Sequence, residues 1–572
     1  MTRATAEILA EARAWRDADP DPETRRELGA LIEAGDTSAL AERLQPLSFG
    51  TAGLRGAVGA GPGRMNLAVV LRAAHGIASY LTTQPGSSPA PVVIGFDARP
   101  SSRRFAEASA AVLLAAGHRV VAFASPVATP LCAFLGRELG APITIVVTAS
   151  HNPRRDNGYK VYGANAVQII APVDREIAAQ IAQAPAARLV PTTHVDFASP
   201  PPAGLELIDA AHLDGYFSAI SAALPRADVA RDLPIVHSAL HGVGTAPMRR
   251  TLADAGFVCV SSVPAQAEPD GSFPTTPFPN PEEPGTMDLA LAEGERQHAA
   301  LILVSDPDAD RLAAAARLDG ALTVLDGNQV GALLADYLLS RRSAAGRALV
   351  FSSVVSSPLV AVLAERYGAH SERTHTGFKW LWNAALALEA RNAGSFCFAY
   401  EEALGYSVFS AVRDKDGIAA GRALAELAAE QAGRGATLFD RLFDIYREHG
   451  LWASAALNVA LSGTDAPARV SRALDALRTA KFELEGDRVV RVVDYRDAAA
   501  RSAWLGAAAL LELELASGGR VLVRPSGTEP KLKLYGHVRR TVTRRSDFSR
   551  ELAAARRFAA ALLRAVEASL QL

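Results

Sequence analysis

The feature that most constrains the fold of this chain is a strand, loop, helix, strand unit that occurs three times. In each copy an apolar strand leads into a polar loop, a helix, a glycine and a second strand. The copies occupy residues 91–124, 233–263 and 347–374. Strands that alternate with helices favour parallel pairing, with the helices on the faces of the sheet. We therefore predict three related α/β domains.

The last part of the chain follows a different pattern. From about residue 455 it reads as a strand, a helix over 466–481, strand-like runs ending in GGRVLVRPSGTEPKLKLYGHV and a helix near 547–572. The N-terminus reads as amphipathic helices. Because 572 residues exceed the usual size of one domain, we expect about three to five domains, and the three repeated units with this C-terminal part make four. Their predicted ranges are 1–225 (N-terminal helices and α/β), 226–340 (α/β), 341–455 (α/β) and 456–572 (a smaller α+β domain).

Composition narrows the class of function. The formal net charge is −2 and no Lys/Arg-rich block is present, which argues against nucleic acid or an anionic membrane as a partner. No apolar run is long enough to span a bilayer, and the N-terminus lacks the apolar core of a secretion signal. Cys132, Cys259 and Cys397 are far apart, which favours neither a disulfide framework nor a zinc site. We expect a cytoplasmic enzyme that acts on small molecules.

The first informative loop is TASHNPRRDNGYK, residues 148–160, which follows an apolar run. Ser150 in this loop could be a nucleophile, a turn residue or a helix cap, and the local sequence leaves the three open. We expect its side chain to be exposed. A serine–histidine–acid triad with His151 is not expected, because adjacent side chains on an extended chain diverge and no partner acid is apparent.

The second loop, SDPDADR, carries three alternating aspartates, Asp306, Asp308 and Asp310. Crowded carboxylates repel one another, and a Mg²⁺ ion, which prefers oxygen ligands, would relieve that repulsion. The alternative is an exposed acidic turn or a set of helix caps. A calcium-binding EF-hand is a poor fit, because Arg311 and Arg317 stand where that loop requires glycine and glutamate.

The third loop, GSFCFAYEEALGYSVF, contains the pair Glu401 and Glu402 in an apolar frame. Carboxylates accept hydrogen bonds from adjacent sugar hydroxyls, so a polyol is a suitable ligand. The alternative is a solvated helix start, where acidic side chains are favoured by the helix dipole. In the nearby run HTGFKW, Lys379 could contact a phosphate or transfer a proton, or it could be an ordinary surface lysine.

The fourth loop is RPSGTEPKLKLYG, residues 524–536. Arg524 and Lys531 supply positive charge, while Ser526, Gly527 and Thr528 offer hydroxyl and backbone N–H donors. Such a set of donors suits a phosphate dianion. The alternative is a basic turn followed by an edge strand.

Together and in this order, the motifs TASHNP, DPDADR and RPSGTEP resemble those of the α-D-phosphohexomutase family, which includes phosphoglucomutases and phosphomannomutases. The similarity runs from FGTAGLRG at residues 49–56 to the C-terminal region and leaves out the N-terminal helices. Within the family, three segments are most similar to the branch of bacterial phosphoglucomutases and animal phosphopentomutases. They are LSFGTAGLRGAVGAGPGRMN, EEALGY and THTGFKW. The resemblance implies four domains around a central cleft, three of them sharing one topology.

The resemblance also implies a mechanism. Ser150 would carry a phosphoryl group, and an oxygen of that group would join Asp306, Asp308 and Asp310 in holding Mg²⁺. The phosphoserine would phosphorylate a sugar 1- or 6-phosphate, giving a sugar 1,6-bisphosphate that returns its other phosphate to the serine. The negative charge calls for nearby cations. The resemblance assigns charge stabilisation to Arg55, Lys160 and Arg311, acid/base work to Lys160 and loop organisation to His151.

For the substrate, the resemblance implies that Glu401 and Glu402 contact sugar hydroxyls, that Arg311 and Lys379 also bind substrate, and that the fourth loop holds the distal phosphate. Phe378 stands where the bifunctional phosphomannomutase branch has histidine, so that role cannot be transferred. We expect interconversion of glucose 1-phosphate and glucose 6-phosphate by a monomer or small homo-oligomer. The alternatives are a phosphomannomutase, a phosphopentomutase, a sugar-bisphosphate synthase and a regulatory protein that only binds sugar phosphates.

Overall fold

The computed structural model describes most of the chain in two compact units. The described residues are 5–49, 53–84, 90–208, 211–224, 226, 228–342, 346–460, 466–479, 483–497, 504–506, 508–525 and 531–570. Unit 1 comprises Met1–Leu224, Pro234–Ala313 and Phe409–Arg422. Unit 2 comprises Pro225–Leu233, Ala314–Val408 and Ala423–Leu572.

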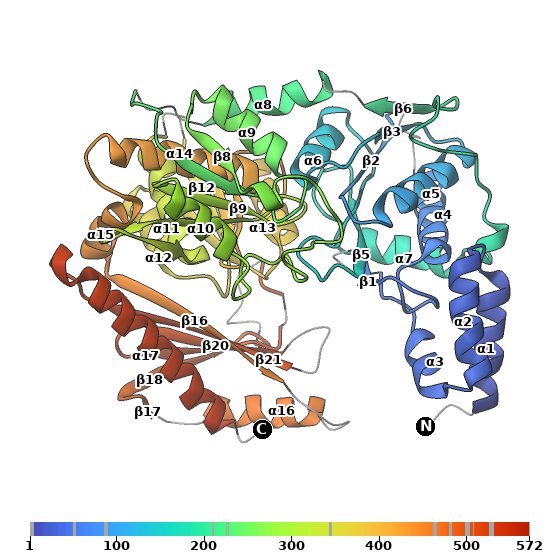
Figure 1. Cartoon of the computed structure of the whole chain (residues 1–572). Coiled ribbons are helices and arrows are strands. Elements are labelled where there is room, and N and C mark those ends of the chain that lie inside the picture. Colours follow the sequence, from blue (N-terminus) through green and yellow to red (C-terminus); the bar gives the residue numbers. More distant parts are fainter. Residues whose placement is uncertain are drawn as a thin grey trace. The chain divides into compact units, whose positions relative to one another are not determined.

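Unit 1 begins with three helices that pack against one another (Figure 1). They are α1 (Thr5–Ala18), α2 (Pro22–Ala34) and α3 (Thr37–Arg43). Asp21 caps α2 by accepting a hydrogen bond from the backbone N–H of Glu23, and α2 ends at Gly35 in the left-handed conformation. The apolar faces of the helices meet in a cluster in which Leu28 and Leu40 are fully buried. The prediction of amphipathic N-terminal helices is confirmed.

A mixed sheet of six strands follows, in the order β1-β5-β4-β2-β3-β6. Its strands are β1 (Leu54–Ala57), β2 (Val92–Phe96), β3 (Val120–Phe123), β4 (Thr144–Val147), β5 (Asp156–Tyr162) and β6 (Leu205–Ile208). Its helices are α4 (Leu67–Thr83), α5 (Ser102–Ala115), α6 (Thr129–Glu138) and α7 (Val173–Gln183). Strands β2 and β3 are parallel on either side of α5 in the chain, which confirms the first predicted unit. Strands β2 and β4 are also parallel, so the loops that follow them leave the same edge.

The second predicted unit lies in the same compact unit. Strand β7 pairs in parallel with both β8 and β9, with α9 between β7 and β8 in the chain. The bounds are α8 (Ala211–Ala223), β7 (Ile235–Ser238), α9 (Thr245–Asp254), β8 (Val260–Ser262), α10 (Asp288–Arg296) and β9 (Leu301–Ser305). All five residues of β9 are buried, so the strand delivers the following aspartates into the interior of the unit.

Strands β10 and β11 form an antiparallel pair that follows β9 in the chain. A four-stranded mixed sheet of unit 2, ordered β13-β12-β14-β15, contains the third predicted unit. Strands β12 and β13 are parallel, with α12 between them in the chain. The strands are β10 (Leu312–Leu318), β11 (Ala321–Leu325), β12 (Ala348–Ser353), β13 (His370–Thr374), β14 (Ser395–Glu401) and β15 (Gly405–Ser407). The helices of unit 2 are α11 (Gly327–Ser340), α12 (Leu359–Arg366), α13 (Phe378–Ala390) and α15 (Leu438–His449). Helix α14 (Gly417–Ala432) begins in the last segment of unit 1 and ends in unit 2.

The C-terminal part of unit 2 is an antiparallel sheet in the order β16-β21-β20-β19-β18-β17. Its elements are β16 (Leu451–Ala460), α16 (Ala466–Thr479), β17 (Glu483–Leu484), β18 (Asp487–Asp494), β19 (Leu511–Leu515), β20 (Arg520–Pro525), β21 (Lys531–Arg540) and α17 (Phe548–Ser569). The predicted fold class, three α/β domains with mixed sheets and a C-terminal α+β domain, is confirmed.

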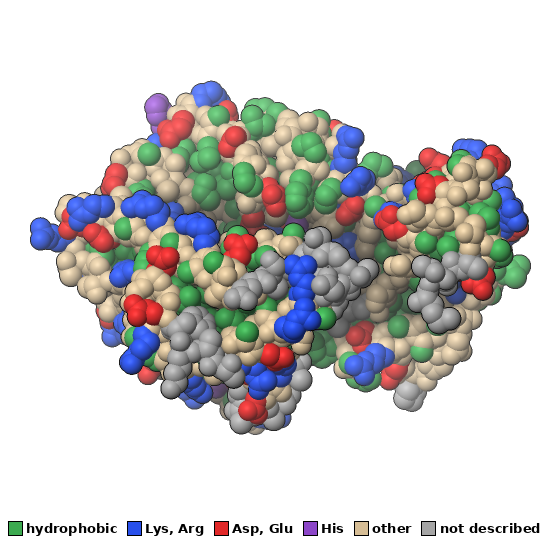
Figure 2. Space-filling model, turned by 90° about the horizontal axis from the view of Figure 1, so that it is seen from below, with side chains coloured by type: hydrophobic (Ala, Val, Ile, Leu, Met, Phe, Trp, Pro, Cys, Tyr) green, Lys and Arg blue, Asp and Glu red, His purple; other side chains and the backbone are tan. Residues whose placement is uncertain are grey.

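The surface agrees with the near-neutral net charge. On the face shown in Figure 2, acidic and basic side chains are interspersed among apolar and uncharged ones. Among the described residues, no helix is both long enough and apolar enough to cross a membrane.

Candidate active site

Ser150 lies in a tight loop between β4 and β5. Its backbone φ is 53°, a left-handed conformation that is uncommon for residues other than glycine. Its N–H donates to the hydroxyl of Thr148 at 2.8 Å, and the residue is only 3% exposed. The expectation of an exposed serine is therefore wrong. Such a backbone persists only where the surrounding structure holds it.

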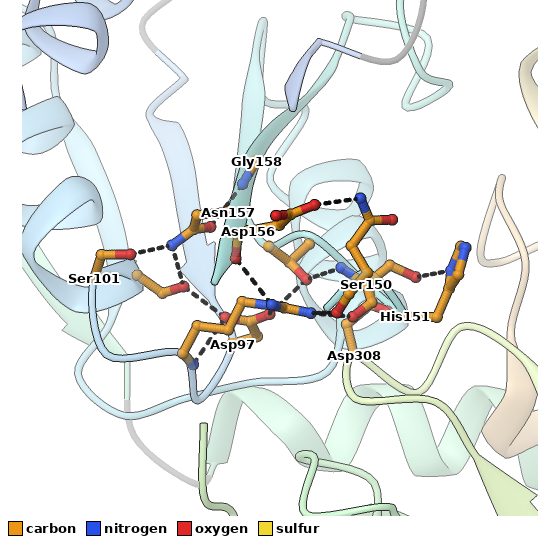
Figure 3. Close-up of polar contacts among 12 residues, drawn as sticks. Asp97, Ser101, Ser150, His151, Asp156, Asn157, Gly158 and Asp308 are labelled. Atoms are coloured by element: carbon orange, nitrogen blue, oxygen red, sulfur yellow. Dashed lines mark hydrogen bonds and ion pairs between the residues drawn. The ribbon is translucent and has the colours of Figure 1, made fainter. Parts of the chain in front are cut away.

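Arg99, from the loop after β2, holds this segment, in which Ser150 and Asp156 are labelled in Figure 3. Its guanidinium donates to four backbone carbonyl groups, those of Ser150 and Asn152 at 2.7 Å and those of Pro153 and Asp156 at 2.8 Å. An arginine can satisfy this many acceptors because it offers five N–H donors in a rigid plane. The loop is thus attached at several points to one side chain that is 2% exposed.

Asp97 holds Arg99 in turn. Its Oδ2 accepts hydrogen bonds from Arg99 Nε at 3.2 Å and from the Thr148 hydroxyl at 2.7 Å, and its Oδ1 accepts from the Ser102 hydroxyl at 2.5 Å. On the far side of the loop, Asn157 donates to the Ser102 hydroxyl at 3.0 Å. The network lies where it does because β2 and β4 are parallel and their carboxyl ends meet at one edge of the sheet.

The side chain of Ser150 contacts an acid directly. Its Oγ donates to Asp306 Oδ2 at 2.7 Å and lies 3.1 Å from His151 Nδ1. The expectation that the side chains of Ser150 and His151 diverge is wrong, because the left-handed backbone at Ser150 departs from the extended chain on which that rule rests. Burial, followed by the charges of Arg311 and Arg55, holds the pKa of His151 well below its usual value, so the imidazole is neutral.

Asp306, Asp308 and Asp310 form a buried cluster. They are 0%, 0% and 1% exposed, so the alternative of an exposed acidic turn is wrong. One carboxylate oxygen of each lies within 4.8 Å of the others. Asp308 Oδ1 and Asp310 Oδ1 are buried and have no hydrogen-bond partner in the part of the chain that the structure describes. Because a buried, unpaired carboxylate oxygen is costly, and because hard cations bind such oxygens, the residues present fit a divalent cation such as Mg²⁺.

Two lysines contact the cluster. Lys160 Nζ lies 2.7 Å from Asp308 Oδ2 and 2.8 Å from Asp310 Oδ2, and Lys415 Nζ lies 3.0 Å from Asp310 Oδ2. Burial alone would lower the pKa of Lys160, but the charges of Asp308 and Asp310 outweigh it and raise that pKa above its usual value. The same balance raises the pKa of Lys415. Both lysines are therefore protonated.

The carboxylates have unequal environments. Burial and the charges of Asp308 and Asp310 raise the pKa of Asp306 well above its usual value. Burial also disfavours ionisation of Asp308, but Lys160 outweighs it and lowers the pKa of Asp308. The Thr129 hydroxyl donates to Asp308 Oδ2 at 2.6 Å. The sequence analysis assigned no role to Lys415, which lies in the polar run RDKDG, or to Thr129.

Two arginines complete this part of the site. Arg55, on β1, lies opposite Gly158 of β5, and its Nη1 donates to Asn152 Oδ1 at 3.2 Å. Burial lowers the pKa of Arg55, and the charges of Asp308 and Asp310 oppose that shift. The backbone N–H of Arg311 donates to Asp306 Oδ1 at 3.0 Å, while its Nη1 contacts Glu282 at 3.1 Å. The structure thus places the predicted residues of the first two loops together in unit 1.

In unit 2, the two glutamates of the third loop stand at the turn between β14 and β15. Glu402 Oε2 accepts hydrogen bonds from the hydroxyls of Ser353 at 2.9 Å and Ser356 at 2.8 Å. Glu401 Oε1 accepts from the backbone N–H of Gly377 at 2.6 Å. The alternative of a helix start is wrong, because Glu401 ends a strand and pairs in register with Gly405.

Lys379 and Arg524 lie near that turn in the same unit. Lys379, in the first turn of α13, is 8% exposed, so it is not an ordinary surface lysine. Arg524 Nη1 donates to the hydroxyl of Thr376, the residue before Gly377. Lys531 begins β21. Ser526, Gly527 and Thr528 lie outside the described residues, so the predicted phosphate loop stays a prediction.

The carboxylate cluster predicts cation binding. Replacing Asp308 by asparagine removes a negative charge and should weaken Mg²⁺ binding by about tenfold or more, within the range by which altered metal sites lose affinity. Calorimetric titration of metal-stripped protein measures this. The control is Asp17→Asn, which alters an exposed acid on α1. Equal Mg²⁺ affinity in both variants would show that the cluster is not the metal site.

The role of Arg99 is testable without any activity assay. Arg99→Lys keeps the charge but loses most of the donors, so backbone amides of residues 148–158 should exchange with solvent faster than in the parent protein. Hydrogen exchange followed by mass spectrometry measures this, with Arg103→Lys, which alters a partly exposed ion pair with Glu107, as the control. Unchanged exchange would mean that the loop is held by other contacts.

Comparison with known proteins identifies the family. The chain matches four models described as phosphoglucomutase/phosphomannomutase: alpha/beta/alpha domains I (46–188), II (214–319) and III (326–446) and the C-terminal domain (483–553). Human phosphopentomutase is 33% identical over 576 residues, covering 93% of this chain and 92% of that protein. The phosphoglucomutase of Staphylococcus haemolyticus is 32% identical over 511 residues, covering 86% and 90%. A phosphoglucomutase/phosphomannomutase family crystal structure from Burkholderia thailandensis has a TM-score of 0.65 at 21% identity, covering 91% and 97%. The chain belongs to the phosphoglucomutase/phosphomannomutase family and is an intramolecular phosphotransferase of the phosphohexomutase type.

Proposed function

We propose that this enzyme interconverts glucose 1-phosphate and glucose 6-phosphate through a phosphorylated Ser150 and a sugar 1,6-bisphosphate. The observation that supports this most is the contact between Ser150 Oγ and Asp306 Oδ2 at 2.7 Å. A phosphoryl group on that oxygen would stand beside the three carboxylates that fit a divalent cation. Phosphoryl transfer requires positioning and the stabilisation of negative charge more than covalent chemistry from the protein.

Two half-reactions account for the net change. In the first, the free hydroxyl oxygen of the sugar phosphate attacks phosphorus, the bond from phosphorus to Ser150 Oγ breaks, and the bisphosphate forms. In the second, Ser150 Oγ attacks the other phosphate, whose bond to the sugar oxygen breaks. In each half-reaction one proton passes from the attacking hydroxyl to the leaving oxygen. We assign this transfer to Lys160, which is protonated and would donate to the leaving oxygen as it takes up the proton of the attacking hydroxyl.

The charged groups of unit 1 have separate roles in this proposal. Asp306, Asp308 and Asp310 would hold Mg²⁺, which when bound neutralises charge on the phosphoryl group. Arg55 and Arg311 supply further positive charge at the same place. His151 is neutral and accepts or donates a hydrogen bond at Ser150 Oγ, so it orients the serine without adding charge.

The substrate-binding part of the proposal concerns unit 2. Glu401 and Glu402 would bind sugar hydroxyls, and their orientation is supported by the hydrogen bonds they accept from Gly377, Ser353 and Ser356. Lys379 would contact the substrate. We assign the distal phosphate of the substrate to the fourth loop: Arg524, Ser526, Gly527, Thr528 and Lys531.

A second candidate function is phosphopentomutase activity. Human phosphopentomutase is as similar to this chain as the staphylococcal phosphoglucomutase is, at 33% against 32% identity. Pentose and hexose phosphates present the same phosphate and neighbouring hydroxyls, so the proposed chemistry would serve both.

The phosphoserine mechanism predicts the behaviour of Ser150→Ala. This variant should lose turnover and carry no phosphoryl group, because the oxygen that would carry that group is gone. Coupled assay and intact-mass measurement, before and after incubation with glucose 1,6-bisphosphate, test it. Ser101→Ala, which removes a hydroxyl from the loop after β2, is the control that should still become phosphorylated. A phosphorylated, active Ser150→Ala protein would exclude the mechanism.

The sugar preference is tested by a panel of glucose 1-phosphate, mannose 1-phosphate and ribose 1-phosphate, each with Mg²⁺ and a trace of the matching bisphosphate. We expect the highest kcat/KM for glucose 1-phosphate. A higher kcat/KM for ribose 1-phosphate would assign the enzyme to pentose phosphates while leaving the phosphoserine mechanism in place.

A further inference from the structure

The N-terminal helical unit, α1 to α3, precedes the segment matched by the first family model, which begins at residue 46. It nevertheless packs closely on the rest of unit 1. Its apolar cluster contains Leu28 and Leu40 together with Ala60, and all three are fully buried. Ala60 belongs to the loop after β1, the strand that carries Arg55. The helical unit therefore meets the site through this loop.

A single ion pair binds both backbone polar groups of Ala60. Arg43 Nη1 lies 2.5 Å from Glu27 Oε1 and donates to the carbonyl of Ala60 at 3.2 Å. The N–H of Ala60 donates to Glu27 Oε2 at 2.8 Å. The carbonyl of Arg43 also accepts the N–H of Gly63 at 2.7 Å. Hydrogen bonds with a charged partner are stronger than neutral ones, so this clamp of Glu27 and Arg43 fixes the loop.

The loop is shaped to fit the clamp. A Cβ on Gly59 would lie 3.3 Å from both Arg43 Nη1 and Glu27 Oε1, and one on Gly61 would lie 2.8 Å from the carbonyl oxygen of Arg43. One on Gly63 would lie 2.5 Å from the carbonyl oxygen of Gln45. Gly61 and Gly63 thus permit a backbone approach that a Cβ would block, and a Cβ at Gly59 would force the Arg43 or Glu27 side chain to shift.

The clamped loop folds back on β1. The N–H of Met65 donates to the carbonyl of Ala57 at 2.9 Å, and the N–H of Val58 donates to that of Arg155 at 2.8 Å. The Asn66 amide closes the loop by donating to the carbonyl groups of Gly59 and Gly61 at 2.8 and 2.7 Å. In the described sheet β1 is an edge strand of four residues that pairs only with β5. A short edge strand needs this second attachment to hold one position.

We propose that the helical unit is a positioning element for the mutase reaction, in which the Glu27–Arg43 clamp on Ala60 sets the place of Arg55 beside Asp308 and Asp310. This inference rests on the proposed function, because it gives Arg55 a role at the transferred phosphoryl group. Neither Glu27 nor Arg43 touches the reacting atoms. They act through the loop after β1.

The test is a double-mutant cycle. Glu27→Ala should lower kcat by about tenfold, because a displacement of about 1 Å at a catalytic group costs up to about 100-fold. In an Arg55→Ala background the same change should have almost no further effect on kcat, since non-additivity marks residues that act through one another. Steady-state kinetics give kcat for the four proteins. The substrate is the sugar phosphate with the highest turnover, and the temperature is well below that of unfolding.

Two further variants separate positioning from stability. Glu42→Ala removes an exposed ion pair, 2.7 Å long, between α3 and Arg64 of the same loop, and it should leave kcat unchanged. Glu27→Gln keeps an acceptor for the Ala60 N–H and should recover part of the lost kcat. Additive effects of Glu27→Ala and Arg55→Ala, or an equal loss in Glu42→Ala, would overturn the proposal.

A measurement independent of turnover keeps the inference distinct from the proposed function. In Glu27→Ala, but not in Glu42→Ala, amides of residues 53–66 should exchange faster with solvent, while those of β2 stay protected. Unchanged exchange overturns the clamp whatever the enzyme acts on. An inactive parent protein with this exchange pattern would instead contradict the proposed function and leave the clamp supported.

Discussion

The structure of the site depends on the cost of burying three carboxylates side by side. Asp306, Asp308 and Asp310 are buried away from water. In the protein interior like charges repel one another more strongly than they do in water. Lys160 and Lys415 offset this repulsion by direct ion pairs. The two lysines come from segments far apart in the chain, so each segment must be held accurately in place for the cluster to exist. Oxygens that remain unpaired in this cluster are where a divalent cation fits.

In unit 1, the segments of the site are held in position by arginines that bind backbone groups rather than substrate. Arg99 joins four carbonyl groups of the Ser150 loop, and Arg43 with Glu27 binds both polar groups of Ala60. In both places a charged side chain, itself held by an acid, organises a segment with unusual backbone geometry. Ser150 and Arg55, to which we assign roles at the transferred phosphoryl group, thus lie in segments held by residues outside the proposed chemistry.

The sequence predicted the repeated α/β units and the loops of the site because both leave local signals. Alternation of apolar strands and helices is visible over short windows, and the family motifs are continuous. Predictions about single side chains were less successful. The rule that adjacent side chains diverge failed at Ser150, because its backbone is left-handed rather than extended. Lys415 and Thr129 were missed as partners of the aspartates, because their contacts join distant parts of the chain.

By itself, the sequence determined the fold class, the number of repeated units, the family and the residue types available for phosphoryl transfer. Only the tertiary structure decided that Ser150 is buried, that its hydroxyl contacts Asp306, that His151 is neutral and that Lys160 is charged. The reason is physical. Propensity and motif depend on neighbours along the chain, whereas burial and charge state depend on distances of a few ångströms between segments that the sequence separates.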